Sequence, residues 1–271
     1  MTDSFAGAEA KLSLEEHLLA RRAGGAKLLV PYITAGYSKE WLETVVAIAE
    51  AGADAIEIGV PFSDPIMDGP VIQAASQAAL ERGVTPASAM AELATIDVDV
   101  PLVVMTYCNL AFHAGFSRFA GWLKSARVTG TIFPDLPLEE SGEWAAVGAE
   151  VDIANILLVS PTTPAERAAR IARASRGFVY GVGLMGVTGV RSSLAETASS
   201  IATSLKAATD RVVLVGVGIS TPDQAAEVAT HGDGVVVGSA LVKRLNEGAG
   251  PNGAYEFVAS LRAALDSIPA G

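Results

Sequence analysis

The feature that most limits the fold of this chain is an alternation that recurs eight times. A short apolar run ends in Gly, Pro or polar residues and is followed by an Ala-rich segment with helical spacing. Such an alternation is typical of parallel strands joined by helices. The runs predict strands at residues 27–33, 55–59, 102–106, 130–133, 153–158, 177–181, 212–216 and 234–237.

The segments between these runs predict the helices. They lie at residues 39–51, 71–82, 116–126, 139–150, 164–174, 194–207 and 222–230, with extra helices at 14–22 and 86–95. Eight strand–helix units in roughly 250 residues favour a single (β/α)8 TIM barrel over an open doubly wound sheet. No low-complexity linker or charge run marks a second domain, so residues 1–271 are expected to form one barrel domain.

Composition disfavours several classes of function. The chain carries 30 acidic and 19 basic residues, a net charge of −11, without any Lys/Arg run, which argues against nucleic acid or an anionic membrane as a partner. Cys108 is the one cysteine, no secretory signal pattern opens the chain, and no apolar stretch approaches the roughly 20 residues that span a bilayer. We therefore expect a soluble, cytoplasmic protein.

The segment EIGVPFSDPIMDGP, residues 57–70, supplies the first candidate for catalysis. Alternate side chains of a barrel strand face the interior, so Ile56 and Ile58 are expected to pack outward and Glu57 inward. Glu57 lies near the C-terminal end of its strand, where such barrels carry their chemistry. An unpartnered buried carboxylate is costly, which favours a catalytic acid or base; a structural network of hydroxyls and amides is the alternative.

Two aspartates follow in the same segment, and their residue types leave their roles open. Asp64 precedes a proline and Asp68 a glycine, so each could be a turn residue. The proline-braced loop could instead return one of them toward the cavity of Glu57. Two carboxylates in different environments can divide acid and base duties.

Three glycine clusters predict a site for an anion. GVGLMGVTG (181–189), GVGIS (216–220) and GSALVK (238–243) follow the sixth, seventh and eighth predicted strands, and so fall at the same end of the barrel. A short helix beginning near Ser239 would direct its free N–H groups at a phosphate, as at the recurrent phosphate site of this fold. The first cluster has the glycine content of a mobile lid.

The sequence lacks the residue patterns for imine, metal and thiol catalysis, which narrows the class of reaction. None of the six lysines sits at the C-terminal end of a predicted strand, where an amine could form a Schiff base. The three histidines form no metal-binding pattern, and none is placed to activate Cys108. Acid–base catalysis on a phosphorylated substrate, with neither metal nor cofactor in this chain, is what remains.

Six stretches together resemble the tryptophan synthase alpha subunit, and they span nearly the whole chain. They are PYITAGY (31–37), EIGVPFSDPIMDGP (57–70), PDLP (134–137), GVTG (186–189), GVGIS (216–220) and GSALVK (238–243). The resemblance implies a lyase of L-tryptophan biosynthesis that cleaves indole-3-glycerol phosphate to indole and glyceraldehyde 3-phosphate. In this retro-aldol reaction the indole ring, protonated at C3, serves as its own electron sink.

The resemblance also implies roles for individual residues. Glu57 would be the general acid/base, and Asp68 would accept a hydrogen bond from the indole N–H. The substrate would further be bound by Tyr180, Thr188, Gly189, Gly218, Gly238 and Ser239, the last four of them at the phosphate. Asp64, Pro65 and Asn109 would meet a beta subunit that carries pyridoxal phosphate, in an alpha-beta-beta-alpha heterotetramer.

One departure from the family pattern concerns the lid, and two other readings of the chain stay open. The family usually has a Ser-Arg pair shortly before GVTG, whereas this chain has Gly183 and Leu184, so the contribution of that arginine must be absent or supplied elsewhere. A sugar-phosphate isomerase or epimerase would share the glycine clusters but not residues 57–70. A non-catalytic scaffold that binds and activates a partner is the second alternative.

Overall fold

A closed barrel of parallel strands forms the centre of the molecule. The computed structural model describes residues 12–183 and 192–269, and within them eight strands pair in chain order, with β8 returning to β1. The strands are β1 Leu28–Thr34, β2 Ile56–Gly59, β3 Leu102–Met105, β4 Val128–Ile132, β5 Ala154–Val159, β6 Val179–Val182, β7 Val213–Gly216 and β8 Gly234–Val237. The predicted (β/α)8 barrel is confirmed, and each strand lies within two residues of its predicted bounds.

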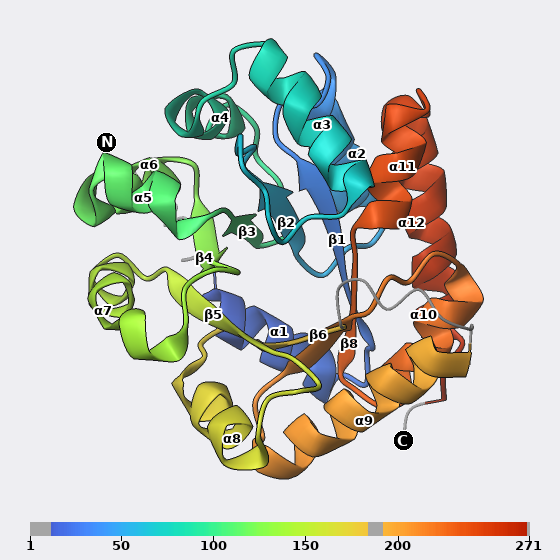
Figure 1. The fold of residues 1–271 in the computed structure, drawn as a ribbon. Coiled ribbons are helices and arrows are strands. Elements are labelled where there is room, and N and C mark those ends of the chain that lie inside the picture. The colour runs from blue at the N-terminus through green and yellow to red at the C-terminus, as the bar shows by residue number, and fades with distance from the viewer. Residues whose placement is uncertain (1–11, 184–191, 270–271) are drawn as a thin grey trace, which may run out of the picture.

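Helices form a ring around the strands (Figure 1). They are α1 Leu14–Ala23, α2 Trp41–Glu50, α3 Pro70–Glu81, α4 Pro86–Leu93, α5 Cys108–Ala114, α6 Phe116–Ser125, α7 Gly142–Glu150, α8 Ala165–Ala174, α9 Ser192–Ala208, α10 Pro222–Ala229, α11 Ser239–Asn246 and α12 Gly250–Asp266, with a 3-10 turn at Leu138–Glu140. The extra N-terminal helix and the short helix after β8 are present as predicted. Helices α5 and α12 were not predicted.

Both unpredicted helices have a local reason for escaping sequence patterns. Helix α5 has seven residues and stops at Gly115, whose φ is +83°, so it is too short to display a helical period. Helix α12 begins with Gly-Pro-Asn-Gly, a run typical of turns. Its stability comes from packing, because Phe257, Val258 and Leu261 are buried where α12 lies against α2 and α10.

Helix α1 closes the N-terminal end of the barrel. Ser13 and Glu16 form a capping box that starts the helix, and Leu14 and Leu18 are buried in the interior cluster of the strands. A Cβ atom at Gly130 or at Gly177 would lie 2.8 or 2.6 Å from Leu14 Cδ2, so glycine is needed at both positions to admit this side chain. The opposite, C-terminal end of the barrel is therefore the end left for a site.

The side chains of β2 divide between the interior and the helices as predicted. Ile56 and Ile58 belong to the cluster between strands and helices, together with Trp41 of α2. Ala55, one residue before β2, belongs to the interior cluster with Val103 of β3. Glu57 lies on this inward side and is 1% exposed.

A buried aspartate ties α1 and α12 to the N-terminal end of the barrel. The Asp54 side chain is 1% exposed and accepts hydrogen bonds from Leu29 N–H at 2.8 Å, Arg21 Nε at 2.6 Å and Arg262 Nη1 at 3.0 Å. Removing the charge would take from Arg262, whose side chain is 11% exposed, its buried carboxylate partner and leave it the exposed Asp266 and the Lys27 carbonyl. Loss of this buried pair costs more than the loss of a surface ion pair.

We expect Asp54→Asn to lower the free energy of unfolding by about 2 to 3 kcal/mol in urea titrations. Glu247→Gln is the matched control, because Glu247 is 64% exposed and its pair with Lys243 spans 3.9 Å. The control should cost about 0.5 kcal/mol or less. Equal losses in the two variants would contradict the anchoring role of Asp54.

Candidate active site

Glu57 combines deep burial with an unsatisfied carboxyl group. It is paired across the sheet with Tyr32 of β1 and Val103 of β3, and Oε2 is buried with no hydrogen-bond partner among the described residues. Loss of hydration, reinforced by the negative charge of Asp68, raises the pKa of Glu57 to about 8. At neutral pH the carboxyl group therefore keeps its proton, which makes it an available acid.

Asp68 has a different environment in the loop between β2 and α3. Tyr107 Oη donates a hydrogen bond to Asp68 Oδ2 at 3.3 Å and accepts one from Met67 N–H at 2.8 Å. The Tyr107 ring stacks on Phe62 with 5.0 Å between ring centres, which holds the hydroxyl in place. Burial raises the pKa of Asp68, and the Tyr107 hydrogen bond opposes that shift by stabilising the ionised form.

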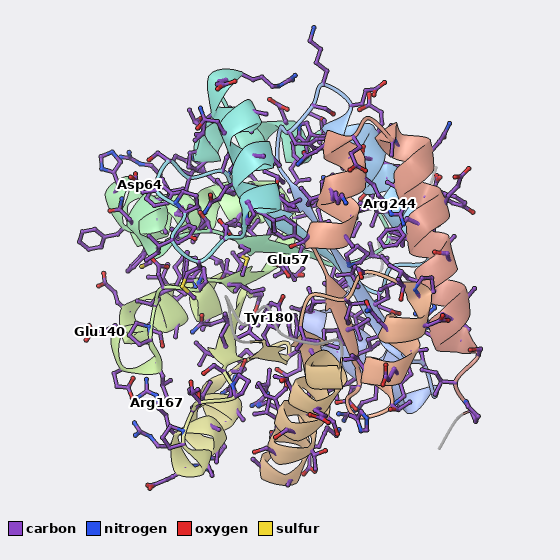
Figure 2. All side chains as sticks on the ribbon, turned by 45° about the vertical axis from the view of Figure 1, so that its right-hand side comes forward. Glu57, Asp64, Glu140, Arg167, Tyr180 and Arg244 are labelled. Carbon is purple, nitrogen blue, oxygen red and sulfur yellow. The ribbon has the colours of Figure 1, made fainter. Side chains whose placement is uncertain are left out.

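Asp64 lies away from this pair, although it belongs to the same loop. Its side chain is exposed and accepts a hydrogen bond from Ser63 Oγ at 2.5 Å, and its carbonyl accepts one from Ile66 N–H. Figure 2 shows Asp64 near the margin of the molecule and Glu57 at its centre. Of the two aspartates that the sequence left open, Asp68 is the one whose charge acts on Glu57.

Asp64, Pro65 and Asn109 lie on the surface beside the barrel mouth. Asp64 and Asn109 are exposed and Pro65 is half-buried. Two large apolar side chains stand next to them, Ile66 at 81% and Phe112 at 69% exposure. The loop between β2 and α3 and helix α5 thus each present a large apolar side chain to solvent.

Tyr180 brings a phenol from β6 to the centre of the barrel. It is 8% exposed, and in Figure 2 it lies close to Glu57 in the middle of the ring of strands. Burial and the neighbouring charge of Glu57 raise the pKa of Tyr180 above its ordinary value, so the phenol stays protonated. Its hydroxyl occupies the space beside Gly216, where a Cβ atom would come within 2.7 Å.

The glycines after β7 and β8 leave backbone N–H groups accessible. Gly218 has a φ of +81°, and no atom lies within 4 Å of the position that a Cβ atom would take. Gly238 precedes α11, which has no side-chain cap. Leu241 and Val242 donate to the Gly238 carbonyl, which leaves the N–H groups of Ser239 and Ala240 without an acceptor within the helix. Because β7 and β8 are neighbours, this arrangement suits a bound phosphate.

Helix α11 is also joined to the helix that follows Asp68. Asn246 Nδ2, at the end of α11, donates a hydrogen bond to the Val71 carbonyl of α3 at 3.1 Å. Val242 of α11 and Ala75 of α3 belong to one buried cluster. Helix α11 and the loop that carries Asp68 are therefore held in place by the same contacts.

The expectations about the lid fall outside the described residues. Thr188, Gly189 and Leu184 lie there, so their predicted roles stay predictions. Gly183 is described: it is half-buried, and its N–H donates to the Gly216 carbonyl at 2.9 Å.

Two tyrosines of the site were missed by sequence reasoning. Tyr107 follows β3 directly and contacts a residue 39 positions earlier in the chain, a pairing that no local pattern reveals. Tyr32 belongs to PYITAGY, but only the barrel register places it beside Glu57. Their position at the C-terminal ends of strands is the one signal that could have drawn attention to them.

A cavity of about 290 Å³ lies at the C-terminal ends of β4, β5 and β6, and neither Glu57 nor Asp68 lines it. Its wall combines apolar side chains, among them Met67, Leu158 and Val182, with the polar side chains of Asp135, Ser160, Thr163 and Arg167. Within residues 12–183 and 192–269, no group of His, Cys, Asp or Glu side chains is arranged to hold a metal ion. No helix in the same ranges is long and apolar enough to cross a membrane.

The closed barrel, with the buried Glu57 near the C-terminal end of β2, is typical of a (β/α)8-barrel enzyme. The chain belongs to the tryptophan synthase alpha chain family, whose model matches residues 19–265. The family resemblance deduced from the sequence motifs is thereby confirmed.

Individual relatives cover most of the chain. The tryptophan synthase alpha chain of Rippkaea orientalis is 46% identical over 227 residues, 81% of this chain and 84% of its own length. That of Synechococcus elongatus is 40% identical over 95% of this chain and 98% of its own. A structure of Mycobacterium tuberculosis tryptophan synthase superimposes with a TM-score of 0.86 at 39% identity, covering 93% of this chain and 97% of the matched one.

The raised pKa of Glu57 has a measurable cost in stability. Between the ordinary pKa of 4.5 and the folded value of about 8, the folded protein keeps a proton that the unfolded chain has released, so this group lowers stability as pH rises. Glu57→Gln removes that penalty. We expect its stability advantage over the parent to grow between about pH 5 and about pH 8, by on the order of 3–5 kcal/mol. Urea unfolding of both proteins at several pH values tests this, and a constant difference would contradict it.

Proposed function

We propose that Glu57 and Asp68 carry out in this chain the reaction of its family, the retro-aldol cleavage of indole-3-glycerol phosphate to indole and glyceraldehyde 3-phosphate in tryptophan biosynthesis. The observation that carries the assignment is the buried Glu57, protonated at neutral pH beside a second carboxylate with a different environment. A sugar-phosphate isomerase or epimerase can also use two carboxyl groups as acid and base, but it would not share the segment EIGVPFSDPIMDGP, residues 57–70. A non-catalytic scaffold would have no use for the buried pair.

The first step uses Glu57 as an acid. Its proton passes to C3 of the indole ring, and the ring nitrogen becomes positively charged. The ionised Asp68, held by Tyr107, accepts a hydrogen bond from the indole N–H and stabilises this charge.

The second step uses the same residue as a base. Glu57, now ionised, takes the proton of the hydroxyl on the carbon attached to C3. That oxygen forms the aldehyde, the carbon–carbon bond breaks, and its electron pair restores the aromatic ring. Glu57 ends the cycle protonated, as it began, so no outside proton donor is required.

The phosphate is assigned to the backbone of Gly218, Gly238 and Ser239, and to Gly189 of the lid. A helix N-terminus and open glycines can hold an anion in a protein with a net charge of −11. Tyr180, whose hydroxyl lies beside Gly216 and whose neighbour is Glu57, would also contact the substrate, and Thr188 would help to close the site.

The chain itself uses no cofactor, and it works in a complex with a beta subunit, to which pyridoxal phosphate belongs. We assign this contact to Asp64, Pro65 and Asn109, supported by the exposed Ile66 and Phe112 beside them. An alpha-beta-beta-alpha heterotetramer in the cytoplasm, with residues 1–271 as one domain of each alpha subunit, completes the proposal.

We expect Glu57→Gln to lower the rate of indole formation from indole-3-glycerol phosphate roughly 1,000-fold, because the proton donor and acceptor is lost. Asp68→Asn should lower it roughly 100-fold, since the charge that stabilises the ring cation is lost. Both rates are measured on the isolated chain by the appearance of indole.

Asp64→Asn is the matched control in the same loop. Without the beta subunit it should retain the parent rate, because Asp64 faces solvent. No indole from the parent chain, with or without a beta subunit, would reject the proposed function. A parent-like rate for Glu57→Gln and Asp68→Asn would reject the site.

We expect Phe112→Asp to weaken binding of the beta subunit at least tenfold, because a charge would replace an apolar anchor. Titration calorimetry with the beta subunit measures this, and indole formation by the isolated variant should stay unchanged. Tyr255→Asp is the control, since Tyr255 is 44% exposed on α12, away from α5 (Figure 1). Equal weakening by both variants would contradict the proposed contact surface.

A further inference from the structure

The hydroxyl group of Tyr32 is a buried polar group that the reaction described above does not use. Tyr32 lies on β1, is 6% exposed, and is paired across the sheet with Glu57. Its ring packs in one cluster with Ala75 of α3 and Val242 of α11. These contacts fix the ring between the two helices that border the site.

The position of the hydroxyl follows from a close approach to β2. A Cβ atom at Gly59 would lie 1.9 Å from Tyr32 Oη, so the phenol occupies the space that a side chain at residue 59 would take. Side chains alternate along a strand, and Gly59 therefore faces the same side as Glu57, one step nearer the mouth. The Tyr32 hydroxyl thus covers Glu57 from the mouth of the barrel.

In the described part of the chain, the hydrogen bonds leave Glu57 Oε2 without a donor and the Tyr32 proton without an acceptor, and the buried Thr106 Oγ1 is also unpaired. Thr34 Oγ1 donates to Tyr32 Oη at 3.4 Å, which satisfies the phenol oxygen but not its proton. When Glu57 loses its proton, the buried carboxylate needs a donor.

We propose that Tyr32 is a positioning residue for Glu57: its O–H donates a hydrogen bond to the ionised carboxylate and stabilises the base form that takes the hydroxyl proton in the second step. The inference rests on the proposed function for its catalytic consequence, but the contact itself is independent of it. Tyr32 of β1, which had no role until now, thereby takes part in the reaction.

The groups around the Tyr32 hydroxyl keep it protonated, so it remains a hydrogen-bond donor. Asp68 from the β2–α3 loop, Glu57 from β2 and Tyr107 from the start of α5 face the Tyr32 hydroxyl, and burial with these charges raises the pKa of Tyr32. Tyr180 of β6 approaches Glu57 from another strand. The Tyr32 phenol consequently stays protonated at every pH at which the enzyme works.

The direct test is a titration of Glu57 in the ligand-free full chain. Carbon-13 NMR of glutamate side-chain carboxyl groups, with Glu57 assigned by its absence in Glu57→Gln, should follow a transition near the pKa of about 8 in the parent. In Tyr32→Phe, which keeps the ring and removes the donor, we expect this transition to rise by about one pH unit.

The kinetic test separates positioning from a merely structural role. The free enzyme needs protonated Glu57, so kcat/KM should decline above about pH 8 in the parent and about one pH unit higher in Tyr32→Phe. At neutral pH kcat should fall about tenfold with KM little changed, because the hydrogen bond forms to the charge that arises during turnover.

Tyr37→Phe is the matched control. Tyr37 packs against the same cluster, but its hydroxyl pairs with Thr44 Oγ1 of α2 at 3.0 Å. It should leave both the titration of Glu57 and the pH profile unchanged. An unaltered or lowered Glu57 transition in Tyr32→Phe, or a rise found only in Tyr180→Phe, overturns the proposal. A rise in a chain that forms no indole supports the contact and rejects the proposed function.

Discussion

The burial of one carboxyl group is the constraint on which the rest of the site depends. An exposed glutamic acid is ionised at neutral pH and has no proton to give to carbon. Inside the ring of strands Glu57 keeps its proton, because Ile56 and Ile58 turn toward the helices and Glu57 alone on β2 turns an acid inward. Burying the Glu57 carboxyl group lowers the stability of the fold. The apolar layers of the barrel and helix α1, which closes the N-terminal end, offset this loss.

The two carboxyl groups of the site, Glu57 and Asp68, differ in their environments, and this difference lets them take different roles. Glu57 has an oxygen without a donor among residues 12–183 and 192–269, which favours its neutral form, whereas Asp68 is held by the Tyr107 hydroxyl, which favours its ionised form. The contrast suits an acid that shuttles a proton and an anion that stabilises a cation. It arises from neighbours on different strands and not from the residue types themselves.

Much of this architecture could be predicted from the sequence. The eightfold alternation of apolar runs and Ala-rich segments predicted every strand, and strand periodicity alone placed Glu57 inward. What could not be predicted depends on contacts distant in the chain. Helix α12 begins with turn-forming residues and is held by packing on α2, and the hydrogen bond from Tyr107 to Asp68 crosses from one strand end to the next. The choice between Asp64 and Asp68 likewise required the course of the loop in space.

The hydrogen bond between Asn246 and the Val71 carbonyl has a consequence for selectivity. It couples α11, at whose start a phosphate would sit, to α3, which begins two residues after Asp68. Under the proposed assignment, the spacing between the phosphate site and Asp68 is fixed by the packing of these two helices. A substrate analogue with one carbon more or fewer between the indole ring and the phosphate would then place a different bond beside Glu57.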